Sequence, residues 1–157
     1  MRFPPRPIDA TLHGVTDYSV GTTLLTAFPR LTGISGTESA RQIRTAGAIH
    51  AGYSTLTDYP LGLVKLIPFK VHLGLDALGA LALAATPFVT GQWQKGARHW
   101  VPHVALCLFE LSSLAISDPT GRGDFHGDVE AVRRANAVDP HRKIHEGGPA
   151  VRRPAAA

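Results

Sequence analysis

The sequence has one cysteine, one methionine and two tryptophans among its 157 residues. A single cysteine, Cys107, excludes an intramolecular disulfide, and its apolar neighbours predict a small core residue. The chain also lacks a glycine-rich phosphate loop, a cysteine pair, a nucleophile elbow and a Ser-His-Asp ordering. No catalytic motif therefore favours an enzyme, although the residues do not exclude one. The prolines of the N-terminal MRFPPRP interrupt the apolar run that a signal peptide needs, so we expect no cleaved leader.

Basic residues exceed acidic ones, with 16 Lys and Arg against 12 Asp and Glu and a formal net charge of +4. They are scattered at the ends of apolar segments and form neither a stripe nor a patch interleaved with aromatics. The pattern therefore argues against a nucleic-acid partner. Charge at segment ends is instead typical of membrane topology.

Four apolar segments are predicted to span a lipid bilayer as helices. Residues 7–29 and 71–94 contain no Lys or Arg, and each window is long enough to cross about 30 Å of hydrocarbon. Residues 100–117 form a third run that only Glu110 interrupts. Residues 44–60 are less apolar but rich in small residues, which let membrane helices approach closely. The capping-box pattern of Ser39 and Gln42 marks the start of that helix, and Pro60 is expected to end or kink it.

Four spans place both termini on one side of the membrane. Eleven of the 16 basic residues then lie on the side of the termini and five on the other. The positive-inside rule predicts that both termini are cytoplasmic. Residues 119–157 are rich in turn-forming residues and are predicted to form a polar, extended or disordered cytoplasmic tail.

One arrangement occurs twice, as His13, Asp17, Pro29 and Gly33 and again as His72, Asp76, Pro87 and Gly91. In both copies the His and the Asp are four residues apart and share one helix face. An apolar run of helix length follows and closes on Pro-x-x-x-Gly. Internal repetition of this kind indicates two similar units.

Each predicted span carries one histidine and one acid, at separations that return to the same helix face. The pairs are His13 with Asp17, His50 with Asp58, His72 with Asp76, and His103 with Glu110. Depth along the spans, at about 1.5 Å per residue, predicts two layers. The near layer is His13, Asp17, Asp58, His72 and Asp76, and the second layer is His50, His103 and Glu110.

Four interpretations of these layers remain open. The groups could pair with one another and hold the helices together, joined by hydroxyls such as those of Thr57 and Tyr59. They could bind a transition metal, because His and carboxylate are suitable ligands and bundles hold metals between facing helices. They could form a proton path. A haem between His50 and His103 is the fourth alternative. The sequence alone predicts no cofactor.

The segments LHGVTDYSVGTTLLTAFPRLTG, STLTDYPLGLVKLIPFKVHLGLDALGALALAATPFVTG and WVPHVALCLFEL resemble the SPW-repeat family of small bacterial integral membrane proteins. The resemblance covers residues 12–118 and implies an inner-membrane protein of four helices in two hairpins, with no established activity. Phe28-Pro29-Arg30 and Thr86-Pro87-Phe88 stand where that family has Ser-Pro-Trp.

We therefore expect an all-α, four-helix transmembrane domain at residues 1–118, followed by the tail at residues 119–157. The expected location is the bacterial inner membrane. The expected role is structural or accessory, as a subunit or stabilising partner of a larger membrane assembly, with a membrane-protein partner or a homo-oligomer. The alternatives are a metal- or cofactor-binding membrane protein and a proton-coupled carrier, both using the His/Asp cluster.

Overall fold

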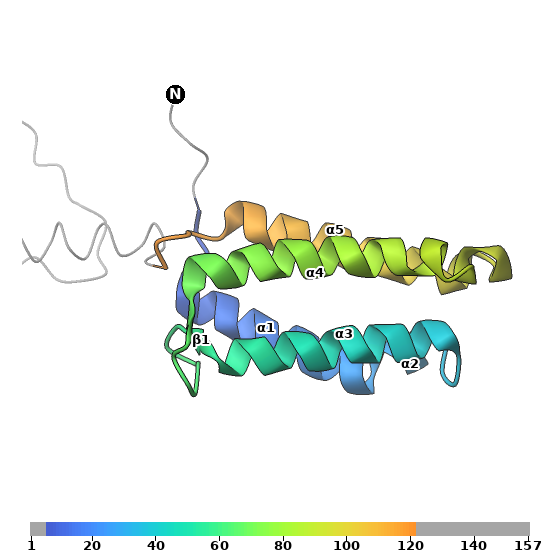
Figure 1. Cartoon of the computed structure of the whole chain (residues 1–157), viewed down its shortest axis with the longest axis horizontal. Coiled ribbons are helices and arrows are strands. Elements are labelled where there is room, and N and C mark those ends of the chain that lie inside the picture. The colour runs from blue at the N-terminus through green and yellow to red at the C-terminus, as the bar shows by residue number, and fades with distance from the viewer. Residues whose placement is uncertain (1–5, 122–157) are drawn as a thin grey trace, which may run out of the picture. The chain divides into compact units, whose positions relative to one another are not determined.

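The computed structural model describes residues 6–121, which form helices joined by short turns (Figure 1). The α-helices are α1 (Ala10–Thr26), α2 (Phe28–Leu31), α3 (Glu38–Thr55), α4 (Phe69–Val89) and α5 (Val101–Ile116). Two 3₁₀ helices, η1 (Gln92–Lys95) and η2 (Ala97–His99), connect α4 to α5. Two very short strands are β1 (Thr57–Asp58) and β2 (Ile67–Pro68), which pair in parallel. The predicted all-α class is confirmed.

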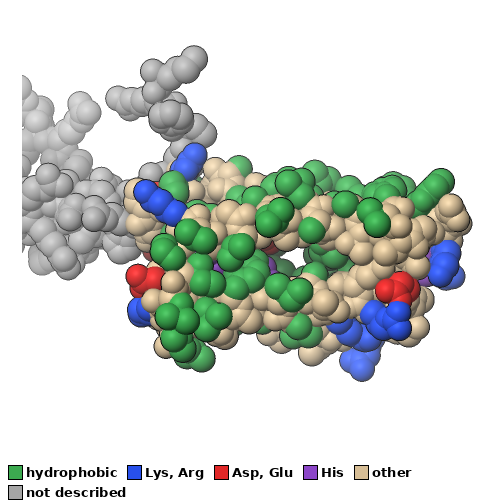
Figure 2. Space-filling model, in the orientation of Figure 1, with side chains coloured by type: hydrophobic (Ala, Val, Ile, Leu, Met, Phe, Trp, Pro, Cys, Tyr) green, Lys and Arg blue, Asp and Glu red, His purple; other side chains and the backbone are tan. Residues whose placement is uncertain are grey.

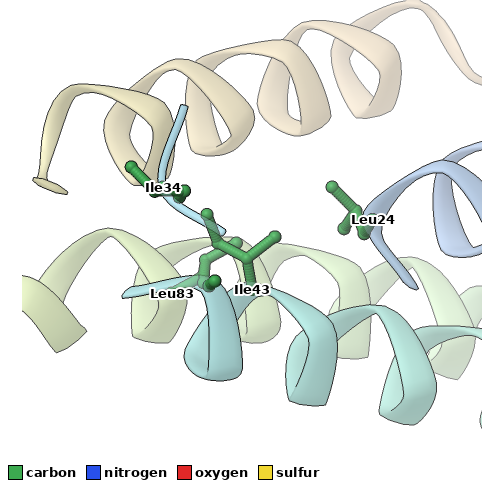
Figure 3. Close-up of a cluster of buried hydrophobic side chains, with 5 residues drawn as sticks. Leu24, Ile34, Ile43 and Leu83 are labelled. Carbon is green, nitrogen blue, oxygen red and sulfur yellow. The ribbon is translucent and has the colours of Figure 1, made fainter. Parts of the chain in front are cut away.

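The long helices form two hairpins that lie in two layers. Helix α1 packs along α3, and α4 packs along α5, whereas the main contact between the layers is made by α3 and α4 (Figure 1). The hydrophobic core between them is small. One cluster consists of Leu24, Ile34, Ala40, Ile43 and Leu83, drawn from both hairpins and from the turn after α2 (Figure 3). A second cluster consists of Ala10, Tyr59 and Phe69.

Both copies of the repeat end at a glycine in the left-handed region, with φ of 67° at Gly33 and 72° at Gly91. Each glycine directly follows the C-cap residue of a helix. A left-handed residue commonly ends a helix at this position, and glycine adopts that conformation without the steric cost of a Cβ. The prolines differ between the copies. Pro29 lies in the first turn of the separate helix α2, but Pro87 lies inside α4, which continues to Val89. The second run therefore ends between the proline and the glycine of the Pro-x-x-x-Gly pattern.

The start of α3 also differs from the prediction. The Thr37 side chain, not Ser39, caps the helix by accepting a hydrogen bond from the Ala40 N–H. The Ser39 hydroxyl instead donates to the His99 carbonyl at 3.1 Å. The helix ends at Thr55, five residues before Pro60, because the chain turns into β1.

Backbone hydrogen bonds at two places, between β1 and β2 and between residues 8–10 and 116–121, fix the ends of the long helices. The pairing of β1 with β2 brings the residues after α3 alongside the start of α4. At the other place, the Asp118 N–H donates to the Ile8 carbonyl at 2.8 Å, and the Ala10 N–H donates to the Gly121 carbonyl at 3.1 Å. The first turn of α1 therefore lies beside the end of α5. Residues 119–121 take part in this closure, and the rest of the predicted tail lies outside the described residues.

Several polar and ionisable side chains are buried, and many large apolar side chains are exposed. Histidines, aspartates and serines are among the most buried residues, whereas long apolar side chains are exposed over the outer faces of the helices (Figure 2). Those at least half exposed on α4 and α5 are Val71, Leu78, Leu81, Val89, Leu108 and Phe109. Among residues 6–121 one helix, α4, is both long and apolar enough to cross a membrane, and α5 is apolar but has 16 residues.

The close approach of α1 and α3 gives a test of the hairpin packing. A Cβ added at Gly47 would lie 2.7 Å from the Leu24 Cβ and 3.1 Å from the Gly21 carbonyl oxygen, both closer than normal contact. We expect Gly47→Ala to lower the free energy of unfolding by about 1–3 kcal/mol, because the helices must separate. At Gly52 on the same helix an added Cβ meets nothing within 4 Å.

Gly52→Ala is therefore the matched control, and we expect it to be neutral or stabilising because alanine favours helix over glycine. Thermal unfolding followed by circular dichroism compares the two variants. Equal melting temperatures for both would contradict the packing of α1 on α3.

Candidate functional site

Four buried ionisable side chains meet where the two hairpins face each other. His13 and Asp17 come from α1, and His72 and Asp76 come from α4. None is more than 2% exposed. Each pair is spaced i, i+4, so that both side chains leave their helix on one face. The structure brings these four residues together, and we call them the inner cluster.

Each histidine of the inner cluster contacts both carboxylates through its Nε2 atom. His13 Nε2 lies 3.4 Å from Asp17 Oδ1 and 3.1 Å from Asp76 Oδ2. His72 Nε2 lies 2.9 Å from Asp17 Oδ2 and 3.2 Å from Asp76 Oδ2. Although these last two distances are short, the His72 Nε2 atom makes no hydrogen bond to either carboxylate. The histidine of each hairpin thus lies next to the aspartate of the other, His13 beside Asp76 and His72 beside Asp17.

The other ring nitrogen of each histidine, Nδ1, points away from the carboxylates and contacts a hydroxyl group. His13 Nδ1 lies 2.9 Å from the Ser117 Oγ, and His72 Nδ1 lies 2.7 Å from the Thr57 Oγ1. Each hydroxyl also lies 2.8 Å from the carbonyl oxygen four residues earlier in the chain. A carbonyl oxygen can only accept, so each hydroxyl donates its single proton there and accepts from the histidine Nδ1–H. Both Nε2 atoms are thus the ones that point inward.

Each of these hydroxyls comes from the hairpin opposite to that of the histidine it contacts. His13 belongs to the first hairpin, and Ser117 follows the last helix of the second. His72 belongs to the second hairpin, and Thr57 follows the last helix of the first. The repeat seen in the sequence is therefore a pseudo-twofold arrangement around one site.

A third histidine repeats the same orientation beside the inner cluster. The Tyr53 hydroxyl donates to Asp76 Oδ1 at 2.6 Å, so it accepts from the His50 Nδ1–H at 2.7 Å. His50 Nε2 then faces Asp17 Oδ1 at 3.5 Å without a hydrogen bond. His50 is 12% exposed, more than any member of the inner cluster.

This arrangement suits a metal ion. Ligand atoms bonded at about 2.0–2.1 Å to one ion lie about 3.3–3.4 Å from one another in tetrahedral geometry, and neighbouring ones lie about 2.8–3.0 Å apart in octahedral geometry. The separations of nitrogen from oxygen in the inner cluster are 2.9–3.4 Å, although His13 and His72 approach different oxygens of Asp17. One ligand atom from each of the four residues lies within 4.8 Å of the others, so small shifts would close the group around an ion. Metal-binding histidines commonly donate their other ring N–H to a neighbouring acceptor, as His13 and His72 do here. Two imidazoles and two carboxylates are a complete set for a four-coordinate divalent ion.

Asp58 lies outside the cluster, contrary to the prediction. Its side chain is 61% exposed and forms an ion pair with Lys65 at 3.6 Å. The reason is local, because α3 ends at Thr55 and Asp58 belongs to β1. Successive side chains of a strand point to opposite sides, so Thr57 faces inward and Asp58 faces outward.

The predicted second layer is not a single group. His50 lies with the inner cluster, since α3 ends at Thr55 and His50 is only about 8 Å from that end. His103 lies on α5 about 10 Å from Glu110 along the helix axis. It is fully buried, and neither ring nitrogen has a hydrogen-bond partner within residues 6–121. No ring contact or hydrogen bond in the described part of the chain joins His50 to His103, so the arrangement gives the haem interpretation no support.

The sequence analysis did not predict that the hydroxyls of Tyr53 and Ser117 contact histidines of the site. A signal for Ser117 exists, because Thr57-Asp58 after the second long helix is matched by Ser117-Asp118 after the last one. Tyr53 lies three residues after His50 on the same helix face. Four hydroxyls, those of Thr16, Tyr18, Thr57 and Tyr59, were expected to join the histidines and acids. Thr57 contacts His72 Nδ1, and the Tyr59 hydroxyl donates to Asp17 Oδ2 at 3.3 Å. Thr16 and Tyr18 donate instead to the carbonyls of Leu12 and Leu61.

A cavity of about 460 Å³ lies between the two layers and reaches the cluster. It extends along α3 from Glu38 to Tyr53, and Figure 2 shows an opening between the layers, with histidine atoms partly visible to one side of it. Its walls are mainly apolar and include Leu24, Ile49, Leu83, Leu106 and Phe109. His50, Tyr53, Asp76 and Glu110 line its polar end. The volume is in the range of small-molecule sites.

Comparisons of the chain with protein-family models, curated proteins and solved structures find no match. The resemblance to the SPW-repeat family stays a prediction.

Proposed function

We propose that this chain is a small integral membrane protein that binds a divalent transition-metal ion between its two helical hairpins. The ligands are the Nε2 atoms of His13 and His72 and the carboxylates of Asp17 and Asp76. The observation that carries the proposal is the orientation of the two histidines. Both donate their Nδ1–H to a hydroxyl and turn their other nitrogen toward the same two carboxylates.

The membrane part of the proposal is supported by the exposure of apolar side chains. Soluble monomers rarely expose contiguous apolar surface over whole helices, but this is the ordinary condition of helices in lipid. Helix α4 has the length and hydropathy of a membrane span, and 28% of its most apolar window is buried inside the protein. The remainder is available to contact acyl chains. Helices α1, α3 and α5 have 17, 18 and 16 residues, close to the minimum needed to cross.

The metal part of the proposal is supported by charge. Two buried carboxylates are costly in a low-dielectric interior unless cations neutralise them. No Lys or Arg side chain contacts Asp17 or Asp76 among the described residues. The only neighbouring bases are histidines, so either two extra protons or one divalent ion balances the pair. The mixed imidazole and carboxylate ligands favour Zn²⁺, Mn²⁺ or Fe²⁺.

The proposal is tested by elemental analysis of protein purified in detergent and dialysed against Zn²⁺. We expect at least one ion per chain in the wild type and a loss of at least one ion in His13→Gln. Asp58→Asn is the matched control, because Asp58 is exposed and lies outside the cluster. A wild-type stoichiometry near zero would overturn the proposal and favour direct pairing of the histidines and carboxylates.

The accessory role within a larger assembly, expected from the sequence, stays a prediction. It is compatible with metal binding, because a structural ion would fix the two hairpins relative to each other and so keep a docking surface in shape.

A further inference from the structure

A second group of metal-binding side chains lies next to the inner cluster. His50 on α3, Asp76 on α4 and Glu110 on α5 each offer a ligand atom, and the three atoms lie within 4.8 Å of one another. Three helices supply this group, and two of them contribute nothing to the inner cluster. Asp76 belongs to both groups.

The two oxygens of Asp76 face different groups. Oδ2 lies 3.1 Å from His13 Nε2 and 3.2 Å from His72 Nε2. Oδ1 accepts the Tyr53 hydroxyl proton and lies 3.9 Å from His50 Nδ1. A carboxylate whose oxygens point to opposite sides can contact one cation with each oxygen.

The other two members of the group are free to act as ligands. The His50 Nδ1–H, 3.9 Å from Asp76 Oδ1, is donated to Tyr53, so Nε2 is the nitrogen left to bind an ion. Nε2 has no hydrogen bond and lies 3.5 Å from Asp17 Oδ1, between the inner cluster and this group. No hydrogen bond or ion pair holds the Glu110 carboxylate within residues 6–121. Both side chains line the polar end of the cavity.

The charge of the Glu110 carboxylate also favours a second cation beside the inner cluster. One divalent ion in the inner cluster would neutralise Asp17 and Asp76 but leave the Glu110 carboxylate uncompensated beside them. Among the described residues that line the cavity, the one Lys or Arg side chain is that of Arg41. It pairs with Glu38 near the other end of the cavity, away from Glu110. An uncompensated carboxylate in such surroundings favours a further cation.

We propose that His50, Asp76 and Glu110 form a second divalent-cation site, the outer site, which shares Asp76 with the inner cluster and faces the cavity. This inference rests on the proposed metal-binding function. Three protein ligands leave at least one coordination position open, as in metal sites where substrates bind. The open position faces the cavity, where a small anion or another Lewis base can reach the ion.

The test is a titration of detergent-purified protein with Co²⁺, followed by elemental analysis and visible absorption. We expect two ions per chain in the wild type and one in Glu110→Gln, which keeps the size of the side chain but removes its charge. Glu38→Gln, at the other end of the cavity, is the matched control and should still bind two. Thermal unfolding of the metal-free proteins checks that both variants are folded.

Sodium azide then probes the open position. We expect it to change the visible spectrum of the Co²⁺-loaded wild type but not that of Glu110→Gln, and no change in the wild type would contradict an open position. One ion per chain in the wild type would overturn the outer site and leave the inner one standing, as would two ions in Glu110→Gln. No bound ion in the wild type would instead overturn the proposed function itself.

Discussion

Replacing Asp76 by alanine is expected to abolish divalent-metal binding and to lower the free energy of unfolding by about 3–5 kcal/mol. Asp76 accepts hydrogen bonds from His13 and Tyr53 and lies 3.2 Å from His72 Nε2. Its removal leaves buried polar groups on both hairpins without their common partner. Chemical or thermal unfolding in detergent measures the loss of stability, and elemental analysis measures the loss of metal.

The control for this variant is Asp58→Ala. Asp58 was predicted to share the near layer, but it is exposed and pairs with Lys65 at the surface. Its removal should change neither metal content nor stability measurably, because exposed ion pairs contribute little. If Asp58→Ala and Asp76→Ala gave the same result, the inner cluster would have no special role.

Thr57→Val is expected to lower the metal affinity by about 10- to 100-fold. The substitution keeps the shape of the side chain but removes the hydroxyl that accepts the His72 Nδ1–H at 2.7 Å. Without this acceptor the imidazole is free to turn or to take the other tautomer, which would place N–H rather than a lone pair toward the metal. A competition titration with a coloured zinc chelator gives the affinity.

Two further variants separate the hydroxyl from its surroundings. Thr57→Ser keeps the hydroxyl and should retain most of the affinity. Thr55→Val removes a hydroxyl that donates only to the Gly52 carbonyl, so it should have no effect on the metal. A Thr57→Val protein that binds zinc as tightly as the wild type would show that His72 needs no orientation by Thr57.

The core of the site could be predicted from the sequence because its rule is local. His and Asp four residues apart share a helix face whatever the rest of the fold does. The repeat of this pair at His13 and His72 then indicated two similar units whose polar faces meet. Helical structure, the two hairpins and the burial of these four side chains follow from that pattern and the apolar runs around it.

The errors came from residues whose position depends on where a helix ends. Pro60 suggested that the second long helix runs to residue 59, but the chain leaves the helix at Thr55 to pair with β2. That early end turns Asp58 outward and brings His50 down to the inner cluster. A strand pair of two residues has no periodicity to detect, so composition alone could not show it.

The role of Ser117, and the contact of each hydroxyl with a histidine of the other hairpin, depend on how the hairpins meet, which a single sequence does not display. Each lies just beyond a helix and meets a histidine of the other hairpin. Since the same exchange occurs twice, we interpret the repeat as one structural unit used in duplicate. Each unit supplies a His/Asp pair to the common site and a hydroxyl to hold the imidazole of the other.

The central claim is that one metal ion joins the two hairpins through two histidines and two aspartates. X-ray absorption at the zinc edge tests it most directly, using Zn²⁺-loaded Glu110→Gln, in which we expect only the inner site to bind. The account predicts four nitrogen and oxygen ligands at about 2.0–2.1 Å, two of them with the multiple scattering of imidazole. A spectrum without imidazole scattering, or a protein that holds no zinc, would contradict it.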